Sequence, residues 1–285
     1  MTQTLRDEDL ALEPTTGSEE FTGFAIVLDG EQVGTVALRT EEPGTASIRW
    51  NSRLEPFVVA RALRLAIEHA FGDEGISRVE VRLGVESVRD IRAASIGGLR
   101  REGIIRTSGD QPDQVLMARL ADDPPAVSRD GFIAILNAGL PTKRVISQGL
   151  LRDEQGRVLL CELTYKKEWD LPGGVVEVGE APSVGLVREL QEELGVTVEV
   201  QGLLTVNWLP AWRGWDDACI FLFDLGTVDS SITGGMTLQP TEIKAIHWCD
   251  PETVRAYGAA AAVELLEAVD AGALPTYREA PKAAE

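Results

Sequence analysis

The chain has 285 residues, 44% of them hydrophobic and 26% charged, so it has the composition of a globular protein and the length of two domains. Its formal net charge is −19, from 46 acidic and 27 basic residues, which argues against a nucleic-acid polymer or an anionic membrane as a general partner. A small nucleotide is not excluded, because a local cation or a metal ion is enough to bind one.

The cysteines are few and far apart, at Cys161, Cys219 and Cys249, with no CxxC spacing. This pattern predicts reduced thiols in a cytoplasmic protein rather than a disulfide framework or a zinc site. The first residues lack the apolar run of a signal peptide, and no uncharged stretch reaches the length of a membrane-spanning helix. We therefore expect a cytoplasmic protein with no membrane partner.

The N-terminal part of the chain alternates strand-like and helix-like patterns. The first 20 residues are acidic and poor in apolar side chains, which predicts a mobile lead-in. Two short apolar runs then flank Asp29 and Gly30, a pattern typical of a β-hairpin. Further along, the apolar spacing predicts helices at 57–71 and 88–99 and strands at 78–83, 103–106 and 114–120.

Three segments of this region carry a resemblance: ALRLAIEHAF at 62–71, GISRVEVRL at 75–83 and ASIGGLRREGIIR at 94–106. They resemble the later two-thirds of a GNAT-type acetyltransferase of the kind that acetylates ribosomal proteins. That family cradles the acetyl-CoA pyrophosphate with an R-x-x-G-x-G/A loop, whereas this chain has RLEPFVV at 53–59, without either glycine. We therefore expect residues 21–120 to form a partial GNAT-like α/β domain that does not acetylate, and that shapes the substrate pocket or mediates dimerisation.

A linker is predicted at 121–141, because ADDPPAVSRDG combines two prolines with alternating charges, although a modest helix or strand is compatible with 132–136. A second domain is expected over 142–270, with a loose tail at 271–285. Its strand patterns stand at 143–153, 158–163, 196–209, 218–225 and 243–248, and its helical patterns stand at 181–194, after Asp250 and at 259–269.

The helix predicted between Pro182 and Gly195 carries an unusual set of charges. These two residues are good start and stop signals for a helix. Glu189, Glu192 and Glu193 are spaced i, i+3 and i+4, so they stack on one face of the helix. Like charges repel there unless a cation lies among them, and Mg²⁺ prefers carboxylate oxygens. The segment therefore predicts a metal site.

The residues around this helix also fill a longer sequence signature. The signature is G-x5-E-x7-R-E-U-x-E-E-x-G-U, where U is a bulky aliphatic residue. Its specified positions are filled here by Gly174, Glu180, Arg188, Glu189, Leu190, Glu192, Glu193, Gly195 and Val196. With these residues the chain resembles a Nudix hydrolase, and the preceding WDLPGG is also typical of that family. The resemblance implies a Nudix α/β/α sandwich with a mixed sheet over residues 142–270.

The resemblance implies a role for each motif residue. Glu192 and Glu193 bind Mg²⁺ or Mn²⁺, and the carbonyl oxygen of Gly174 often joins them. Glu189 is either a further ligand or the base that deprotonates water. Arg188 pairs with a motif glutamate and holds it in register, a task that suits a bidentate guanidinium. The implied catalytic residues are thus Arg188, Glu189 and Glu192, and the implied reaction is attack of metal-activated water on a pyrophosphate linkage.

A fourth acid often comes from a distant loop in MutT-like members, six residues ahead of a strand tryptophan. Glu242 has this spacing from Trp248, so we expect it at the metal site, and a surface glutamate is the alternative. His69 and His247 occupy positions in a helical and a strand pattern, which favours core histidines over ligands.

Candidate substrate contacts gather in a turn-rich stretch with three tryptophans, Trp208, Trp212 and Trp215, and with Arg213. Exposed tryptophan can stack on a nucleobase, and arginine can hold a phosphate. A hydrophobic lid or a dimer contact is the alternative interpretation. Lys167, just before the WDLPGG loop, is a further candidate for contacting the substrate phosphates.

The sequence thus predicts metal-dependent hydrolysis of the pyrophosphate linkage in a nucleoside diphosphate joined to another moiety: a nucleotide sugar, ADP-ribose, a dinucleotide or a nucleoside triphosphate. One alternative is a regulatory module that senses a nucleotide without turnover, but every motif acid is retained. The other is an acetyltransferase with an accessory Nudix domain, but the glycines of the acetyl-CoA loop are missing. The family often dimerises, so a homodimer is compatible with the sequence.

Overall fold

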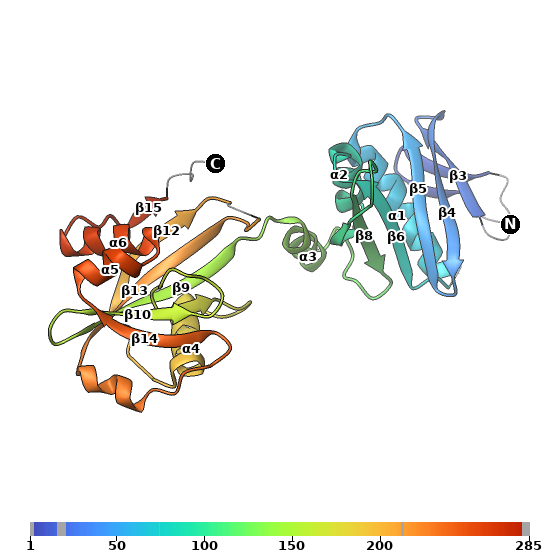
Figure 1. Ribbon diagram of the computed structural model, residues 1–285. Helices are drawn as coiled ribbons and strands as arrows, with labels where there is room; N and C mark the ends of the chain where they lie inside the picture. Colours follow the sequence, from blue (N-terminus) through green and yellow to red (C-terminus); the bar gives the residue numbers. More distant parts are fainter. Residues whose placement is uncertain (1–2, 16–20, 74, 212–213, 281–285) are drawn as a thin grey trace. The chain divides into compact units, whose positions relative to one another are not determined.

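The computed structural model describes residues 3–15, 21–73, 75–211 and 214–280. The chain divides into an N-terminal unit, Met1–Pro141, and a C-terminal unit, Thr142–Glu285 (Figure 1). Both units are mixed α/β structures, as the sequence predicts. No helix among the described residues is long and apolar enough to cross a membrane.

The N-terminal unit is built on a sheet of eight strands in the order β1-β2-β3-β4-β5-β6-β8-β7. Neighbouring strands are antiparallel except β5 and β6, which are parallel. The strands are β1 (Leu5–Asp7), β2 (Leu10–Pro14), β3 (Phe21–Leu28), β4 (Glu31–Glu42), β5 (Thr45–Ser52), β6 (Arg78–Gly84), β7 (Arg100–Ile105) and β8 (Gln114–Leu120), and the helices are α1 (Pro56–Asp73), α2 (Val88–Ile96) and α3 (Arg129–Gly139).

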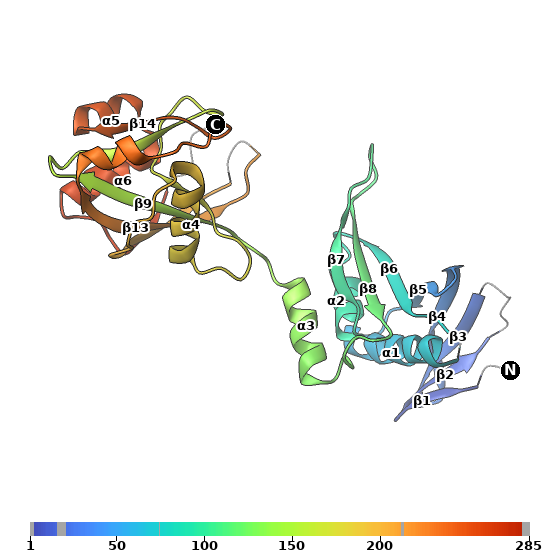
Figure 2. The same ribbon diagram turned by 90° about the horizontal axis from the view of Figure 1, so that it is seen from below.

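One hydrophobic core holds this unit together. Apolar side chains of α1, such as Leu63 and Ile67, pack with Phe24 and Ile26 of the sheet, and all four are fully buried. Helix α1 contacts β1, β2, β4 and β6, and α2 packs beside α1 (Figure 2). The predicted hairpin is present between β3 and β4, where Asp29 and its neighbouring glycine both take positive φ angles of 53° and 84°.

The prediction of a mobile lead-in over the first 20 residues is wrong for its described part. Leu10 and Leu12 are 0% exposed and belong to the core, and Ala11 between them is only 5% exposed, so the start of β2 is buried on both faces. The turn before them is held by Arg61 of α1. Its Nε lies 2.8 Å from Oδ2 of Asp7, and its Nη2 lies 2.8 Å from Oδ1 of Asp9.

The segment predicted as a linker contains helix α3, an 11-residue helix that packs against β7 and α2. The prolines that suggested a linker precede the helix and do not interrupt it. Ser128 caps its N-terminus, since its hydroxyl accepts a hydrogen bond from the N–H of Gly131 at 3.0 Å. Gly131 packs so closely that a Cβ there would lie 2.1 Å from the carbonyl oxygen of Pro125.

The C-terminal unit is built on a second, mixed sheet in the order β14-β10-β9-β13-β12-β15, with β11 paired to β9. The pairs β9–β13 and β12–β15 are parallel, and the others are antiparallel. The elements are β9 (Arg144–Asp153), β10 (Val158–Leu163), β11 (Gly173–Val175), α4 (Pro182–Leu194), β12 (Gly202–Leu209), β13 (Ala218–Val228), the 3₁₀ helix η1 (Ser230–Gly235), β14 (Ile243–Cys249), α5 (Pro251–Tyr257), α6 (Ala260–Asp270) and β15 (Tyr277–Glu279).

Helices cover both faces of this sheet, which confirms the predicted α/β/α sandwich. Successive residues of β9 point to opposite faces, and Leu151 packs with the apolar side of α4. Leu150 packs on the other face with Val254 of α5 and Leu266 of α6. The motif helix α4 is therefore fixed to one face of the sheet by its buried stripe.

Two boundaries in this unit differ from the prediction. The strand expected at 196–209 begins only at Gly202, and the residues before it lie outside any strand. The tail expected to be loose forms β15, in which Tyr277 and Arg278 pair in register with Val206 and Asn207 of β12. Three residues are too few to show the alternating pattern of a strand in the sequence. Pairing with the partner strand β12, which the sequence pattern does not show, is what makes this segment a strand.

Candidate active site

The candidate site is built on helix α4, and the predicted start and stop signals hold it in place. Pro182 occupies the first turn, and Gly195 ends the helix in a left-handed conformation with φ 68°. Leu186, Leu190 and Leu194 are each 0% exposed and face the sheet. This stripe fixes the rotation of the helix and therefore the directions of its glutamates.

Arg188 lies at the centre of the acidic side chains. Its Nε and Nη2 each lie 3.0 Å from an oxygen of Glu180, which is a bidentate pair. Its Nη1 lies 3.1 Å from Oε1 of Glu189 and 3.0 Å from Oε2 of Glu192, and Nη2 also donates to the carbonyl oxygen of Val175 at 3.0 Å. One guanidinium thus ties three motif acids to the strand that precedes the helix.

The electrostatics of these contacts hold Glu180 in its charged form. The hydrogen bond from Arg188 and a second one from the N–H of Glu177 lower the pKa of Glu180. The hydrogen bond to Glu180 is also the first cause that raises the pKa of Arg188. Glu180 therefore serves as an anchor for the guanidinium, which also bonds Glu189 and Glu192.

Glycines in and next to the signature make room for these carboxylates. A Cβ at Gly174 would lie 2.5 Å from the carboxyl carbon of Glu189, and a Cβ at Gly185 would lie 2.8 Å from Oε2 of Glu180. Gly173 has a φ of 133°, and a Cβ there would lie 2.1 Å from the carbonyl oxygen of Ser147. Strand β11 can approach both β9 and α4 only because it begins with these glycines.

Glu193 and Glu242 come together from distant parts of the sequence. Glu193 is only 7% exposed, and its pKa rises to about 8. Burial is the first cause, followed by the charges of Glu189 and Glu242 and a hydrogen bond with the carboxyl group of Glu242. Burial also raises the pKa of Glu189, against the opposing effect of Arg188. Glu242, which is expected here from its spacing to Trp248, therefore lies beside Glu193 on the acidic face of α4.

The four acids predicted as metal ligands are not all directed at one point. Glu192 is more exposed than Glu193, and its carboxylate, like that of Glu189, bonds Arg188. Within the described ranges, no three His, Cys, Asp or Glu side chains form a ready-made group for a metal ion. The structure therefore gathers the acids on one helix turn and its neighbouring loop, with two of them turned toward the guanidinium.

The predicted substrate contacts are only partly described. Trp208 donates from Nε1 to Oδ2 of Asp217 at 3.2 Å. Trp215 is 63% exposed, with the guanidinium of Arg144 4.8 Å from its ring centre. Trp212 and Arg213 lie outside the described residues. The two described tryptophans gather where β9 and β13 begin.

The loop between β10 and the WDLPGG segment contains polar contacts that the sequence patterns did not reveal. Lys166 pairs with Asp170, whose Oδ1 also accepts a hydrogen bond from Nε2 of Gln148 at 3.0 Å. Lys167 is exposed. Asp170 belongs to the WDLPGG segment itself, so its position was available as a signal, whereas Gln148 is brought to it only by the pairing of the strands.

An aromatic stack lies next to this loop. The ring of Trp169 is sandwiched between His247, at 3.9 Å, and Tyr257, at 4.5 Å, and all three rings are nearly parallel. His247 is half-buried, and its Nε2 lies 3.2 Å from Oε2 of Glu162. His69 is a buried core residue, 5.5 Å from the Phe24 ring. The stack fixes the start of the WDLPGG segment against α5.

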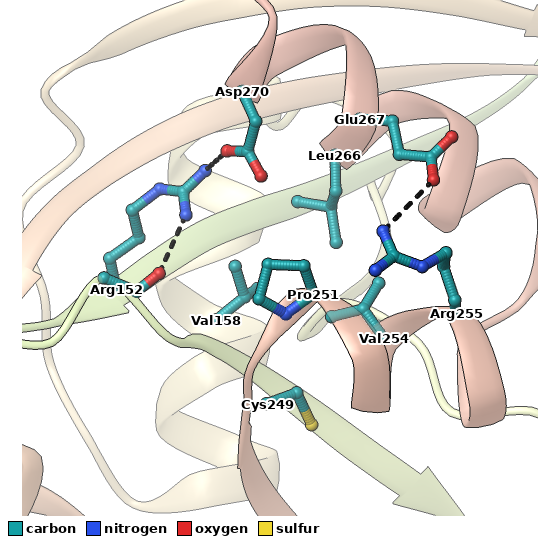
Figure 3. Close-up of a pocket in the computed structure, with 10 residues that line it drawn as sticks. Arg152, Val158, Cys249, Pro251, Val254, Arg255, Leu266, Glu267 and Asp270 are labelled. Carbon is teal, nitrogen blue, oxygen red and sulfur yellow. Dashed lines mark hydrogen bonds and ion pairs between the residues drawn. The ribbon is translucent and has the colours of Figure 1, made fainter.

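A cavity of about 180 Å³ lies elsewhere in the unit, at the end of β10 that is remote from Glu242. Its floor is apolar, and its charged groups are paired with each other: Arg152 lies 2.6 Å from Asp270, and Arg255 lies 3.6 Å from Glu267 (Figure 3). None of the motif acids lines it. The cavity is therefore separate from the candidate site.

A family model and several known proteins match the C-terminal unit. The family model described as NUDIX domain matches residues 143–269. A MutT-like protein from Streptomyces ambofaciens is 34% identical over 48% of this chain and 84% of its own length. A CTP pyrophosphohydrolase from Escherichia coli is 32% identical over 41% of this chain and 84% of its own length. A putative 8-oxo-dGTP diphosphatase from Bacillus subtilis is 30% identical, but the match spans only 63% of its length and 36% of this chain.

Solved structures resemble both parts of the chain. The crystal structure of a MutT protein from Methanosarcina mazei matches 47% of this chain and 98% of its own, with a TM-score of 0.41 and 23% identity. A putative acetyltransferase matches 43% of this chain and 88% of its own, with a TM-score of 0.37 and 18% identity. The acetyltransferase structures cover the N-terminal part.

Proposed function

This chain belongs to the Nudix family and its C-terminal unit is a Nudix pyrophosphohydrolase, and we propose that it cleaves the pyrophosphate linkage of a nucleoside triphosphate with the help of Mg²⁺ or Mn²⁺. The observation that supports this most directly is the gathering of Glu189, Glu192, Glu193 and Glu242 beside Gly174, with Arg188 tying the helix acids to β11.

The donor set fits a hard divalent cation. All four side chains offer carboxylate oxygens, which Mg²⁺ and Mn²⁺ prefer, and the carbonyl oxygen of Gly174 is one more such atom. Burial raises the pKa of Glu193, and so do the charges of Glu189 and Glu242, whose repulsion a bound cation would offset. We assign Glu192, Glu193 and Glu242 to the metal. When bound, the cation activates water and neutralises charge on the phosphoryl oxygens.

The remaining motif residues then have distinct tasks. Glu189 lies against Gly174, and burial raises the pKa of its carboxyl group, so we propose that its carboxylate accepts the proton of the attacking water. Arg188, already bonded to Glu180, Glu189 and Glu192, holds these acids in register. Lysine could not replace it, because it lacks the planar fork that contacts several carboxylates at once.

The proposal of a nucleoside triphosphate rests on the relatives. The CTP pyrophosphohydrolase aligns over 84% of its length, whereas a putative ADP-ribose pyrophosphatase from Bacillus subtilis aligns over 32%. The exposed Lys167 is placed beside the paired Lys166 and Asp170, where it is free to contact a phosphate. We propose that Lys167 contacts the triphosphate, and that Trp208 and Trp215 contribute to the nucleoside side of the site.

The test is hydrolysis by the full chain and by Glu192→Gln. The amide keeps the size of the side chain and removes its charge, so we expect near-intact folding and a loss of at least about a hundredfold in pyrophosphohydrolase activity. Turnover of CTP, 8-oxo-dGTP, ADP-ribose and a nucleotide sugar is measured with Mg²⁺ and with Mn²⁺. Glu199→Gln, at an exposed acid beyond the helix, is the matched control. Equal turnover in Glu192→Gln and wild type would contradict the site.

A further inference from the structure

The loop that carries Glu242 is attached at its beginning to helix α4. The N–H of Thr237 donates to the carbonyl oxygen of Leu194 at 2.9 Å, and the N–H of Gln239 donates to that of Glu193 at 2.9 Å. These carbonyls belong to the last turn of α4, where the helix itself supplies no partner. The beginning of the loop therefore moves with the helix that carries the acids.

The end of the same loop is attached to β10. The pairing of β10 with β14 finishes at Leu163 and Ile243, next to an irregularity in the register. One residue further, the N–H of Thr164 donates to the carbonyl oxygen of Glu242 at 2.9 Å, and the Thr164 hydroxyl donates to that of Thr241 at 2.7 Å. The hydrogen bond of the Thr164 hydroxyl thus links β10 to the Glu242 loop just beyond the last residue pair of β10 and β14.

The hydroxyl of Thr164 can orient the neighbouring loop without contributing to the packing of the core. Its side chain is exposed, so the hydroxyl is not needed to fill the core. Its two bonds end on Thr241 and Glu242, and the Glu242 carboxyl group faces Glu193. The same residue directly precedes the loop that contains the exposed Lys167. Thr164 is therefore the point at which the loop of the proposed phosphate contact and the loop of the distant acid meet.

We propose that Thr164 is a positioning residue, whose hydroxyl holds the carbonyl of Thr241 and thereby keeps Glu242 directed at Glu193 and the metal. This inference rests on the proposed function, in which Glu242 is a ligand. Removing the hydroxyl would leave Thr164 attached to this loop only through its main-chain bond to the carbonyl oxygen of Glu242. Metal affinity would weaken because the ligand has to be ordered on binding, whereas the chemistry at saturating metal would be preserved.

The experiment uses the full chain as wild type, Thr164→Val, Thr164→Ser and Thr227→Val. Mn²⁺ binding is measured by electron paramagnetic resonance without nucleotide, and hydrolysis of CTP is measured over a series of Mg²⁺ concentrations. For Thr164→Val we expect both the Mn²⁺ dissociation constant and the Mg²⁺ concentration for half-maximal activity to rise about three- to tenfold. The kcat at saturating Mg²⁺ should stay within about twofold.

Thr164→Ser should restore wild-type behaviour, because it restores the donor. Thr227→Val makes the same exchange at an exposed position of β13 and should bind Mn²⁺ like wild type. Unchanged Mn²⁺ affinity in Thr164→Val, or equal weakening in the serine and valine variants, would overturn the inference. If the wild type binds Mn²⁺ but hydrolyses no nucleotide, the proposed function fails, and the Mn²⁺ comparison still decides the role of Thr164. A wild type that binds no Mn²⁺ would overturn both.

Discussion

Glu193 is the most tightly buried of the acids at the candidate site, and its ionisation opposes folding. Its pKa rises from the ordinary value of 4.5 to about 8 in the folded protein. A carboxyl group with a raised folded-state pKa binds its proton more tightly when folded. Its contribution to stability is therefore fully present below pH 4.5 and is lost as the pH rises toward 8. A buried acid that opposes folding in this way fits a site at which stability is traded for function.

We predict that Glu193→Gln stabilises the metal-free protein at alkaline pH while abolishing its activity. The amide of Gln cannot ionise. The melting temperature of the variant protein should therefore exceed that of the wild type by a few degrees at pH 8 and by much less at pH 5. Thermal unfolding in the presence of a chelator, at both pH values, measures this difference. All other carboxyl groups are the same in the two proteins, so a pH-dependent difference in melting temperature would come from residue 193. The same difference in melting temperature at pH 5 and at pH 8 would contradict the prediction.

At the same scale, the sequence predicted which residue types meet but not every contact. The spacing of Glu189, Glu192 and Glu193 follows from helix geometry alone, so their common face was predictable. The bidentate contact of Arg188 with Glu180 crosses a turn, and the sequence predicted only that some motif glutamate would be its partner. Thr164 gave no signal, because its role depends on which main-chain carbonyl the neighbouring strand presents.

At the scale of elements, the N-terminal hairpin β1–β2 depends on one arginine. Arg61 is anchored in α1 and bonds Asp7 and Asp9 on either side of the turn. The turn residue Glu8 has a φ of 55°, which is unfavourable for a side chain larger than glycine. The arginine thus bridges the two sides of this turn, and the buried residues Leu10 and Leu12 of β2 follow it.

We predict that Arg61→Met increases amide hydrogen exchange in residues 5–14 by about tenfold, because local opening no longer breaks charged hydrogen bonds. The methionine keeps most of the buried side-chain volume. Exchange measured by mass spectrometry on the intact protein resolves this segment. Arg92→Met, at an exposed arginine of α2, should leave the exchange of residues 5–14 unchanged. Equal exchange in Arg61→Met and wild type would show that the burial of Leu10 and Leu12 alone retains the hairpin.

Elements with their own stop signals or periodicity were predictable, and elements that depend on a partner were not. Helix α4 has Pro182 and Gly195 at its ends, and the β3–β4 hairpin has Asp29 and Gly30 at its turn. By contrast, β1 and β15 are three residues long, and only their pairing with β2 and β12 makes them strands. Helix α3 was obscured by prolines that end just before its Ser128 cap.

At the scale of the molecule, each unit has its own hydrophobic core. The cluster around Leu63 contains only residues of the N-terminal unit, and the clusters around Leu150 and Leu151 contain only residues of the C-terminal unit. A unit with its own core can unfold as a separate cooperative transition. Stability and activity should then be separable between the two parts of the chain.

We predict that Leu63→Ala lowers the unfolding free energy of the N-terminal unit by about 2–5 kcal/mol through cavity formation, and leaves pyrophosphohydrolase activity at 25 °C unchanged. Scanning calorimetry should show one transition moved to lower temperature. Leu151→Ala is the matched variant in the C-terminal unit and should move the other transition instead. If either variant shifts both transitions together, the units do not unfold separately.

The short strand β15 has a consequence for solubility. The family model ends at residue 269, before this strand begins, and the N–H of Val206 and the carbonyl oxygen of Trp208 bond the segment around β15. A protein trimmed to the matched region would leave these groups of β12 open to solvent. Unpaired strand edges recruit other chains and promote aggregation. Strand β15 thus pairs with the backbone groups of β12 that would otherwise be open to strands of other molecules.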